Sequence, residues 1–239
     1  GAFVAACLAL PALLEEIQPV GEPLGLAYLT AWPVLLWGSI GLLVVAVTFW
    51  DERLLRPLTT VESFIASWYL VNGFFFNSMM DVFAGYFQAW TTMTTRYLEL
   101  EPRYAMTDGY IRAVIQLTSL QELFIQAPCG LALFYAYWRG SSWRLGVEIA
   151  FNMWSVAGVW YFYFTEIVLG LPNVHSPFRA DGSLDPSKAF TFDTVWKFWI
   201  GFVVFPALWA VAAVALALRA GAQISALGRA APAAGKKGA

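Results

Sequence analysis

Five apolar segments, each long enough to cross a lipid bilayer, constrain this chain more than any other feature of its sequence. The hydrocarbon core of a bilayer is about 30 Å thick and takes roughly 20 helical residues. The segments cover residues 24–50, 63–88, 110–138, 146–169 and 193–218. No internal repeat relates them. The sequence therefore predicts an all-α integral membrane protein folded as one five-transmembrane-helix bundle.

The composition agrees with a membrane protein and excludes several other classes. Of 239 residues, 59% are hydrophobic and 13% are charged, and a soluble domain rarely has so little charge. The net charge is -2 and the basic residues are scattered, so no surface for nucleic acid is expected. The two cysteines, Cys7 and Cys129, do not form a disulfide framework. The single histidine, His175, excludes a His-rich metal cluster.

The two ends of the chain differ from the apolar segments. Residues 1–22 begin with an apolar stretch that is too short to span and has no basic residue before it, as a signal peptide would. We predict a short N-terminal interfacial segment there, and a cleaved signal is the alternative. Residues 23–219 form the predicted five-helix membrane domain. Residues 220–239 are rich in Ala and Gly and are predicted to be a disordered cytoplasmic tail.

Basic residues near the helix ends predict the orientation. In a five-span arrangement most of them fall on the side of the C-terminus, and this excess marks the cytoplasmic face. They are Arg53, Arg56, Arg139, Arg144, Arg219, Arg229, Lys236 and Lys237. We therefore expect a cytoplasmic C-terminus and a lumenal or external N-terminus.

The third segment carries a polar stripe that includes one acid. At about 100° per residue, five polar side chains share an arc of roughly 120°. They are Arg112, Gln116, Ser119, Glu122 and Gln126. A carboxylate at membrane depth is costly, so Glu122 is taken as a functional residue by default.

The second segment places another acid on a helix face. Asn77 and Asp81 are four residues apart and share that face. Small residues near it would let a neighbouring helix approach closely, namely Ser63, Ala66, Gly73 and Ala84. The fourth and fifth segments carry further stripes, made of Glu148, Asn152, Ser155, Tyr163 and Glu166, and of Asp193 and Lys197. Such stripes are tolerable only if they face one another or a cavity, which predicts a polar pocket inside the bundle.

Structural roles compete with functional ones for several of these residues. Asp193 and Lys197 are better explained as an ion pair near the membrane surface than as chemistry. Glu148 lies close to a membrane end, where it would reach water. Arg112 would neutralise Glu122 or Asp81, and the cluster would then be a packing network. Asp81 with Glu122 is the pair favoured for function.

Aromatic residues crowd the same segments. Many of them must face lipid or form interfacial belts. Together, however, aromatic faces around a carboxyl group suit an apolar ligand that passes through a cation. The aromatic candidates are Trp68, Phe74, Tyr163, Trp199 and Phe202.

Four short motifs resemble one membrane-protein family in order and spacing. They are Arg103-Tyr104 followed by Asp108, the run Glu122 to Pro128, the run Tyr161 to Glu166, and Pro206. On these motifs residues 28–218 resemble the EXPERA superfamily, both its sterol Δ8–Δ7 isomerase (emopamil-binding) branch and its sigma-2 receptor branch. The resemblance implies a five-helix bundle with a sterol-sized cavity.

The resemblance also implies site residues. The isomerase branch uses a His and a Glu four apart on the second span and a Glu on the third. Asn77 and Asp81 match the first two, and either Gln116 or Glu122 matches the third. Trp199 and Phe202 stand where the isomerase has Asn and Trp. The predicted catalytic residues are Asp81, Glu122, Asn77 and Gln116, and the predicted substrate-binding residues are Arg112, Trp68, Phe74, Ser119, Tyr163, Glu166, Trp199 and Phe202.

The predicted function is isomerisation or cyclisation of a sterol or other isoprenoid lipid in the membrane. One carboxyl group would protonate an alkene or epoxide, and another would stabilise the cation and accept a proton. No cofactor is expected, the partners are the lipid substrate and membrane lipids, and the family resemblance implies the endoplasmic reticulum. A non-catalytic sterol- or lipid-binding protein is the alternative, whereas a transporter fits poorly because the segments lack inverted halves. The sequence leaves open the substrate and whether the protein forms a homodimer.

Overall fold

The computed structural model describes residues 32–107 and 109–235, and every long element within them is a helix. The predicted all-α fold is therefore confirmed for this part of the chain. In chain order the elements are α3 (Trp32–Phe49), η1 (Glu52–Leu54), α4 (Thr60–Tyr69), η2 (Leu70–Tyr86), α5 (Thr91–Leu100), η3 (Pro102–Ala105), α6 (Gly109–Gln121), η4 (Glu122–Gln126), α7 (Ala127–Arg139), α8 (Arg144–Leu169), α9 (Phe192–Thr194), η5 (Val195–Val204) and α10 (Phe205–Gly235). The elements η2, η4 and η5 are π-helical and continue the α-helices beside them.

Local sequence explains where several helices begin and end. Thr59 caps α4, because its side chain accepts from the Glu62 backbone N–H while the Glu62 carboxylate accepts from that of Thr59. Gly140 ends α7 and Gly170 ends α8, both with positive φ, a conformation that glycine adopts without a steric penalty. The start of α4 and the ends of α7 and α8 are thus each marked by a residue suited to that position.

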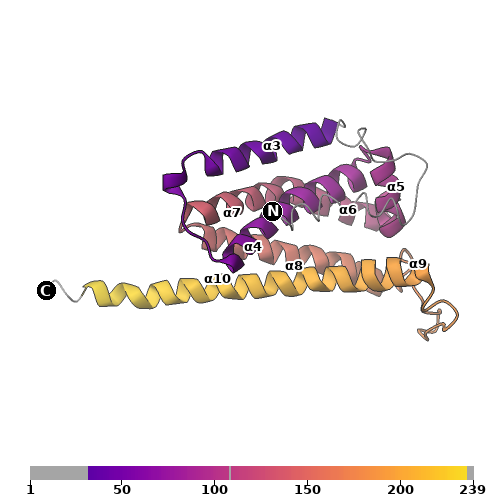
Figure 1. The fold of residues 1–239 in the computed structure, drawn as a ribbon. Coiled ribbons are helices and arrows are strands. Elements are labelled where there is room, and N and C mark those ends of the chain that lie inside the picture. Colours follow the sequence, from indigo (N-terminus) through magenta and orange to yellow (C-terminus); the bar gives the residue numbers. More distant parts are fainter. Residues whose placement is uncertain (1–31, 108, 236–239) are drawn as a thin grey trace.

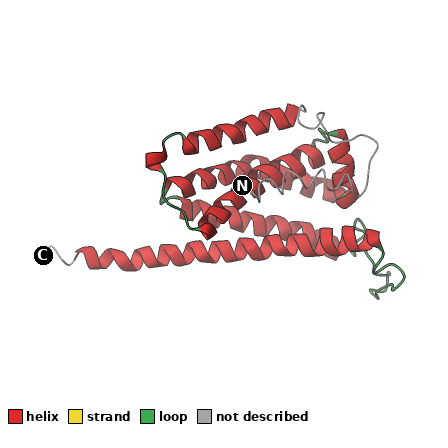
Figure 2. Cartoon of the chain, in the orientation of Figure 1, coloured by secondary structure: helices red, strands yellow, loops and turns green. Residues whose placement is uncertain are grey.

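The helices lie roughly side by side, with α3 along one edge and α10 along the opposite edge (Figure 1). The run from α4 into η2 and the run from α6 through α7 lie between them, and α8 packs along α10. Loops gather at the two ends of the bundle (Figure 2). At its C-terminal end α10 continues well past the other helices.

Two glycines permit a close crossing of η2 and α7. A Cβ on Gly73 would lie 2.8 Å from Gly130 Cα, and a Cβ on Gly130 would lie 2.6 Å from the carbonyl oxygen of Tyr69. Only glycine at both positions lets η2 and α7 approach so closely. Tyr69, Phe134 and Phe151 pack beside the crossing in a buried cluster.

Within the described residues the helices coincide with the five predicted segments, and α5 lies between the second and third segments, where no helix was predicted. Residues 24–31 and the predicted N-terminal segment 1–22 lie outside the described residues. The predicted disordered tail from 220 is instead helical as far as Gly235, because its alanines are strong helix formers.

Hydropathy and length identify fewer candidate membrane spans than the five predicted segments. Among the described residues one helix, Phe192–Arg229, is long and apolar enough to cross a membrane, and Leu35–Phe49 is apolar but shorter. Five membrane crossings therefore stay a prediction.

Candidate functional site

The glycine crossing sets an antiparallel register that brings the predicted polar residues together. One turn from Gly73 and Gly130, the Asn77 side-chain amide donates to Gln126 Oε1 at 2.8 Å, and both side chains are buried. By the same register, Asp81 on η2 and Glu122 at the start of η4 occupy facing positions one further turn along. The favoured pair, Asp81 and Glu122, thus comes from facing positions on η2 and at the start of η4.

Asp81 has a hydrogen-bond donor from a third helix. The Tyr97 hydroxyl, on α5, donates to the Asp81 carboxylate. Gly85, one turn beyond Asp81, makes this contact sterically possible. A Cβ at Gly85 would lie 2.7 Å from the Tyr97 ring and 2.8 Å from the Tyr104 ring. The missing side chain therefore leaves room for both rings over η2.

Glu122 and Ser119 contain buried polar atoms without partners. Glu122 is 8% exposed and Ser119 is 1% exposed. Within the described part of the chain, neither Glu122 Oε2 nor Ser119 Oγ has a hydrogen-bond partner. A buried polar atom left unpaired costs about 1–3 kcal/mol, so a hydrogen-bonding partner would stabilise either of these atoms.

A chain of hydrogen bonds joins the crossing to α8. Gln126 Nε2 donates to Ser155 Oγ at 3.4 Å, and Ser155 in turn donates to the carbonyl oxygen of Phe151 at 3.0 Å. Gln126 therefore both accepts from Asn77 and donates to Ser155, which fixes the orientation of its amide. Asn77 is thus linked through Gln126 and Ser155 to α8.

Gln116 and Arg112 lie at the edge of this group. Gln116 is exposed and donates to the Tyr86 hydroxyl at 3.2 Å, while the Arg112 guanidinium lies 4.6 Å from the Tyr86 ring centroid. Among the described residues Arg112 forms no ion pair with Asp81 or Glu122, so the predicted neutralisation is not observed. The reason is that Arg112 lies almost three turns before Glu122 and stacks on Tyr86.

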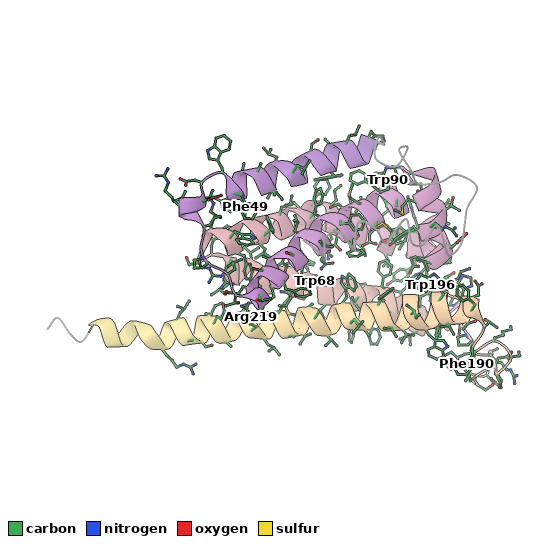
Figure 3. The ribbon with its side chains drawn as sticks, in the orientation of Figure 1. Phe49, Trp68, Trp90, Phe190, Trp196 and Arg219 are labelled. Atoms are coloured by element: carbon green, nitrogen blue, oxygen red, sulfur yellow. The ribbon has the colours of Figure 1, made fainter. Side chains whose placement is uncertain are left out.

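Two of the predicted aromatic residues pack on other faces of the α4–η2 helix. The Trp68 ring lies 5.0 Å from that of Trp209, between the bundle and α10 (Figure 3). Phe74 lies 5.9 Å from the Trp37 ring of α3. The observed contacts of both residues are thus helix-packing contacts.

The remaining predicted residues form a second group near the end of α8. The buried Arg103 guanidinium binds Glu101 at 2.5 and 2.6 Å and lies 3.8 Å from Glu166. Burial opposes its charge, but the contacts with Glu101 and Glu166 outweigh burial and raise the pKa of Arg103. Glu166 also accepts two hydrogen bonds from Asn173, so both of its oxygens have partners.

Aromatic residues of α8 and η5 extend the second group. The Tyr163 hydroxyl donates to the Val203 carbonyl at 2.5 Å, and its ring lies 5.0 Å from that of Phe202. Trp199 donates to the Ala189 carbonyl at 2.8 Å. These bonds tie η5 to α8 and to the preceding loop. The observed contacts of Tyr163, Phe202 and Trp199 thus hold η5 in place.

Two further polar contacts were predicted to be structural. Lys197 Nζ lies 3.1 Å from Asp193, which confirms the ion pair. Glu148 was expected to reach water, and this is wrong because it is fully buried. It accepts from Tyr137 at 2.8 Å and pairs with Arg144 at 3.3 Å and Arg219 at 3.4 Å.

Tyr97 and Gln126 belong to the site but were not among the predicted catalytic or substrate-binding residues. Gln126 was part of the polar stripe and needed only the register of the crossing to be chosen over Gln116. Tyr97 lies in a stretch that was taken as a polar connection, but α5 is amphipathic and buries Met93 on the turn before Tyr97. That spacing of apolar residues was the available signal.

Comparisons with known proteins give no family for this chain. Neither a scan against protein-family models nor a search of curated proteins found a match.

Proposed function

We propose that this protein is a membrane-embedded, cofactor-independent isomerase or cyclase that acts on a sterol or other isoprenoid lipid. One observation carries the proposal, namely that two carboxyl groups face each other with different surroundings. Asp81 accepts a hydrogen bond from Tyr97, whereas Glu122 keeps a buried oxygen without a partner among the described residues. Two carboxyl groups in unlike environments suit an acid and a base.

The proposal includes five membrane crossings. The helices coincide with the five apolar segments, and their outer faces carry many exposed large hydrophobic residues. Examples on α3, α8 and α10 are Leu42 (72% exposed), Val168 (80% exposed) and Val211 (67% exposed). A folded protein in water rarely exposes so much apolar surface, and lipid would cover it.

The proposed reaction assigns one role to each acid. An ionised carboxylate buried without a cation or hydrogen bonds is very costly, so Glu122 is assigned the protonated form. A hydrogen bond donated to a carboxylate stabilises its charge, so Asp81 is assigned the ionised form. Glu122 would transfer its proton to one carbon of an alkene, and Asp81 would then accept a proton from a neighbouring carbon of the cation. The double bond moves, and a proton passing from Asp81 back to Glu122 restores the site.

Protonation of an epoxide would start a cyclisation in the same way. The C–O bond breaks as the oxygen takes the Glu122 proton, the cation is attacked by an alkene of the same chain, and loss of a proton to Asp81 ends the reaction. In both cases the unpartnered Ser119 hydroxyl offers a hydrogen bond to a polar group of the lipid.

Turnover in heavy water tests the proposal. The purified protein in lipid nanodiscs would be incubated with a panel of sterols and linear isoprenoid epoxides, and deuterium in the products would be measured by mass spectrometry. Glu122→Gln and Asp81→Asn should each lower turnover by about 10²–10⁴-fold, the usual contribution of a general acid or base. Asp193→Asn is the matched control, because Asp193 is exposed and its ion pair within the described part of the chain is with Lys197. Full turnover in both site variants would disprove the assignment.

Asn77 is the observation that supports the alternative function, a lipid-binding protein without catalysis. Asn77 stands where the isomerase branch has a proton-carrying His, and here its amide is bound to Gln126. Two results together would favour this function. The protein would form no product from any member of the panel, and it would bind a hydrophobic amine that Asp81→Asn no longer binds.

A further inference from the structure

The Ser119 hydroxyl differs from the other buried serine and threonine hydroxyls in the described part of the chain. Ser119 is 1% exposed, and its Oγ has no hydrogen-bond partner among the described residues. A buried serine or threonine in a helix can donate to the carbonyl oxygen one turn before it, as Thr118 does to Val114 at 2.9 Å. The other buried hydroxyls all take part in hydrogen bonds, and they belong to Thr48, Ser78, Thr94, Thr118, Ser155 and Thr194. The Ser119 donor is therefore available to a bound molecule.

This hydroxyl lies beside the acid to which the proposed reaction assigns the proton. Ser119 and Glu122 are three residues apart, and at this helical spacing two side chains share a face with their Cβ atoms about 5–6 Å apart. Both side chains are buried, and Glu122 Oε2 also lacks a partner within the described residues. Two hydrogen bonds of about 2.7–2.8 Å, one from each side chain, can meet at one oxygen atom across this spacing. The pair therefore suits a single acceptor atom held by two donors.

Two donors on one atom distinguish between the two reactions that the proposed function includes. An alkene carbon can take a proton, but it has no lone pair for a second hydrogen bond. In double-bond migration the Ser119 hydroxyl would thus stay unpaired, at a cost in free energy, unless a second polar group of the lipid lay within one turn of the reacting carbon. An epoxide oxygen has two lone pairs and gains negative charge as its C–O bond breaks. Donors placed where charge develops stabilise the transition state, so the pair favours an epoxide.

The charge of the site favours a neutral oxygen over an anionic leaving group. Asp81 and Glu122 are both acids, and among the described residues neither forms an ion pair with a cation. A diphosphate would place further negative charge beside them, and like charges placed together disfavour binding. A tertiary alcohol is neutral, but its unstrained C–O bond opens less readily with a carboxylic acid than the strained ring of an epoxide.

We propose that the substrate is the terminal epoxide of a linear isoprenoid lipid, whose oxygen accepts hydrogen bonds from both Glu122 and Ser119. The C–O bond breaks as the oxygen takes the Glu122 proton, and Ser119 holds the new hydroxyl group while an alkene of the same chain attacks the cation. Asp81 then takes a proton from carbon, and this proton returns to Glu122. The cyclic product is an isomer of the substrate, so no oxidant, reductant or co-reactant is consumed. The inference rests on the proposed function and selects one substrate class within it.

The destination of the Glu122 proton separates this reaction from double-bond migration. In heavy water the deuteron of Glu122 would end on the epoxide oxygen, from which it exchanges during work-up in light water. Protonation of an alkene would instead fix deuterium on carbon. The purified protein in lipid nanodiscs would be incubated in heavy water with farnesyl acetate, its terminal epoxide, its terminal tertiary alcohol and a Δ8 sterol. We expect a cyclic isomer from the epoxide alone, without carbon-bound deuterium in its mass spectrum.

Ser119→Ala separates the proposed role of the hydroxyl from a structural one. It should lower kcat for the epoxide by about 10–100-fold, less than the loss of an oxyanion-hole donor because the oxygen also receives a proton. It should melt at or above the wild-type temperature, because the Ser119 hydroxyl has no hydrogen bond to lose within the described residues. Thr118→Val is the matched control. It removes the adjacent buried hydroxyl, which bonds to its own helix, and should keep kcat within about twofold.

Four other results would overturn the inference. Turnover of the sterol or of farnesyl acetate with deuterium on carbon, lost in Glu122→Gln but unchanged in Ser119→Ala, refutes the epoxide and leaves the proposed function standing. Equal turnover of the epoxide and the alcohol shows that the strained ring is not what the site requires. A Ser119→Ala variant that loses both rate and melting temperature shows a structural role for the hydroxyl. No product from any of the four lipids counts against the proposed function and this inference together.

Discussion

Adding one methyl group at Gly130 should separate the two helices that carry the site. The Cβ of alanine at this position would lie 2.6 Å from the Tyr69 carbonyl oxygen, while ordinary van der Waals contact begins at 3.4 Å. Because the obstacle is backbone, the helices must move apart by about 0.8 Å, unlike a flexible side chain that could turn away. The same displacement one turn along would lengthen the 2.8 Å Asn77–Gln126 hydrogen bond to about 3.6 Å, beyond bonding distance.

The expected cost of Gly130→Ala follows from three contributions. Overpacking costs about 1–3 kcal/mol. Loss of the buried hydrogen bond costs about 1 kcal/mol. Replacing a helical glycine by alanine returns about 0.5–1 kcal/mol. The net loss is about 2 kcal/mol, or a melting temperature lower by about 4–8 °C for a chain of this size.

Gly158→Ala is the matched control, because Gly158 is also in a helix and a Cβ there would meet nothing within 4 Å. It should stabilise the protein by about 0.5–1 kcal/mol. Both variants would be melted in the same detergent with tryptophan fluorescence as the signal. If Gly130→Ala melts at or above the wild-type temperature, the close crossing is not what positions these helices.

Three further predictions address the polar contacts. Glu148→Gln removes the carboxylate shared by Arg144 and Arg219 and should destabilise the protein by about 3 kcal/mol in the same melting assay, with Glu52→Gln, an exposed position, as the control. The hydrogen bond from Arg56 lowers the pKa of Glu62 to about 2, so its stabilising effect is present above pH about 4.5 and is lost as the pH falls towards 2. The melting temperatures of wild type and Glu62→Gln, which keeps the helix cap, should differ at pH 6, approach each other below pH about 4.5 and converge only near pH 2; a constant difference would contradict this. Tyr97→Phe removes the donor to Asp81 and should lower turnover by about 10–100-fold with little change in melting temperature, whereas an unchanged rate would show that this bond has no part in the reaction.

Much of the helical fold could be predicted from the sequence because its signals are local. Apolar runs gave the helix positions, and Gly140 and Gly170 end helices where their conformational freedom is needed. Gly73 was also expected to permit a close helix approach, and it lies at the crossing with Gly130. Residues 220–235 were predicted to be disordered because the tail is rich in Ala and Gly, but they are helical, since alanine favours helix.

The composition of the site was harder to predict because it depends on contacts between segments far apart in the sequence. Asp81 and Glu122 could each be selected as membrane-depth acids, but their facing positions follow from the crossing at Gly73 and Gly130. Tyr97 reaches Asp81 only because α5 folds back over Gly85. Arg112 shares a calculated helix face with Glu122, yet it stacks on Tyr86. Helical periodicity alone could not show which residues on one helix face reach the site and which pack elsewhere.

The π-helical stretches allow the site to change without loss of the bundle. Asp81 lies in η2 and Glu122 begins η4, and both stretches run into ordinary α-helix. A π-helix holds more residues per turn than an α-helix, so deletion of one residue there can restore α-helical hydrogen bonding. Such a deletion would turn one part of the helix relative to the other about its axis and re-aim the carboxyl group. Short deletions in residues 70–86 or 122–126 are therefore a route by which relatives of this protein could acquire different chemistry on the same helices.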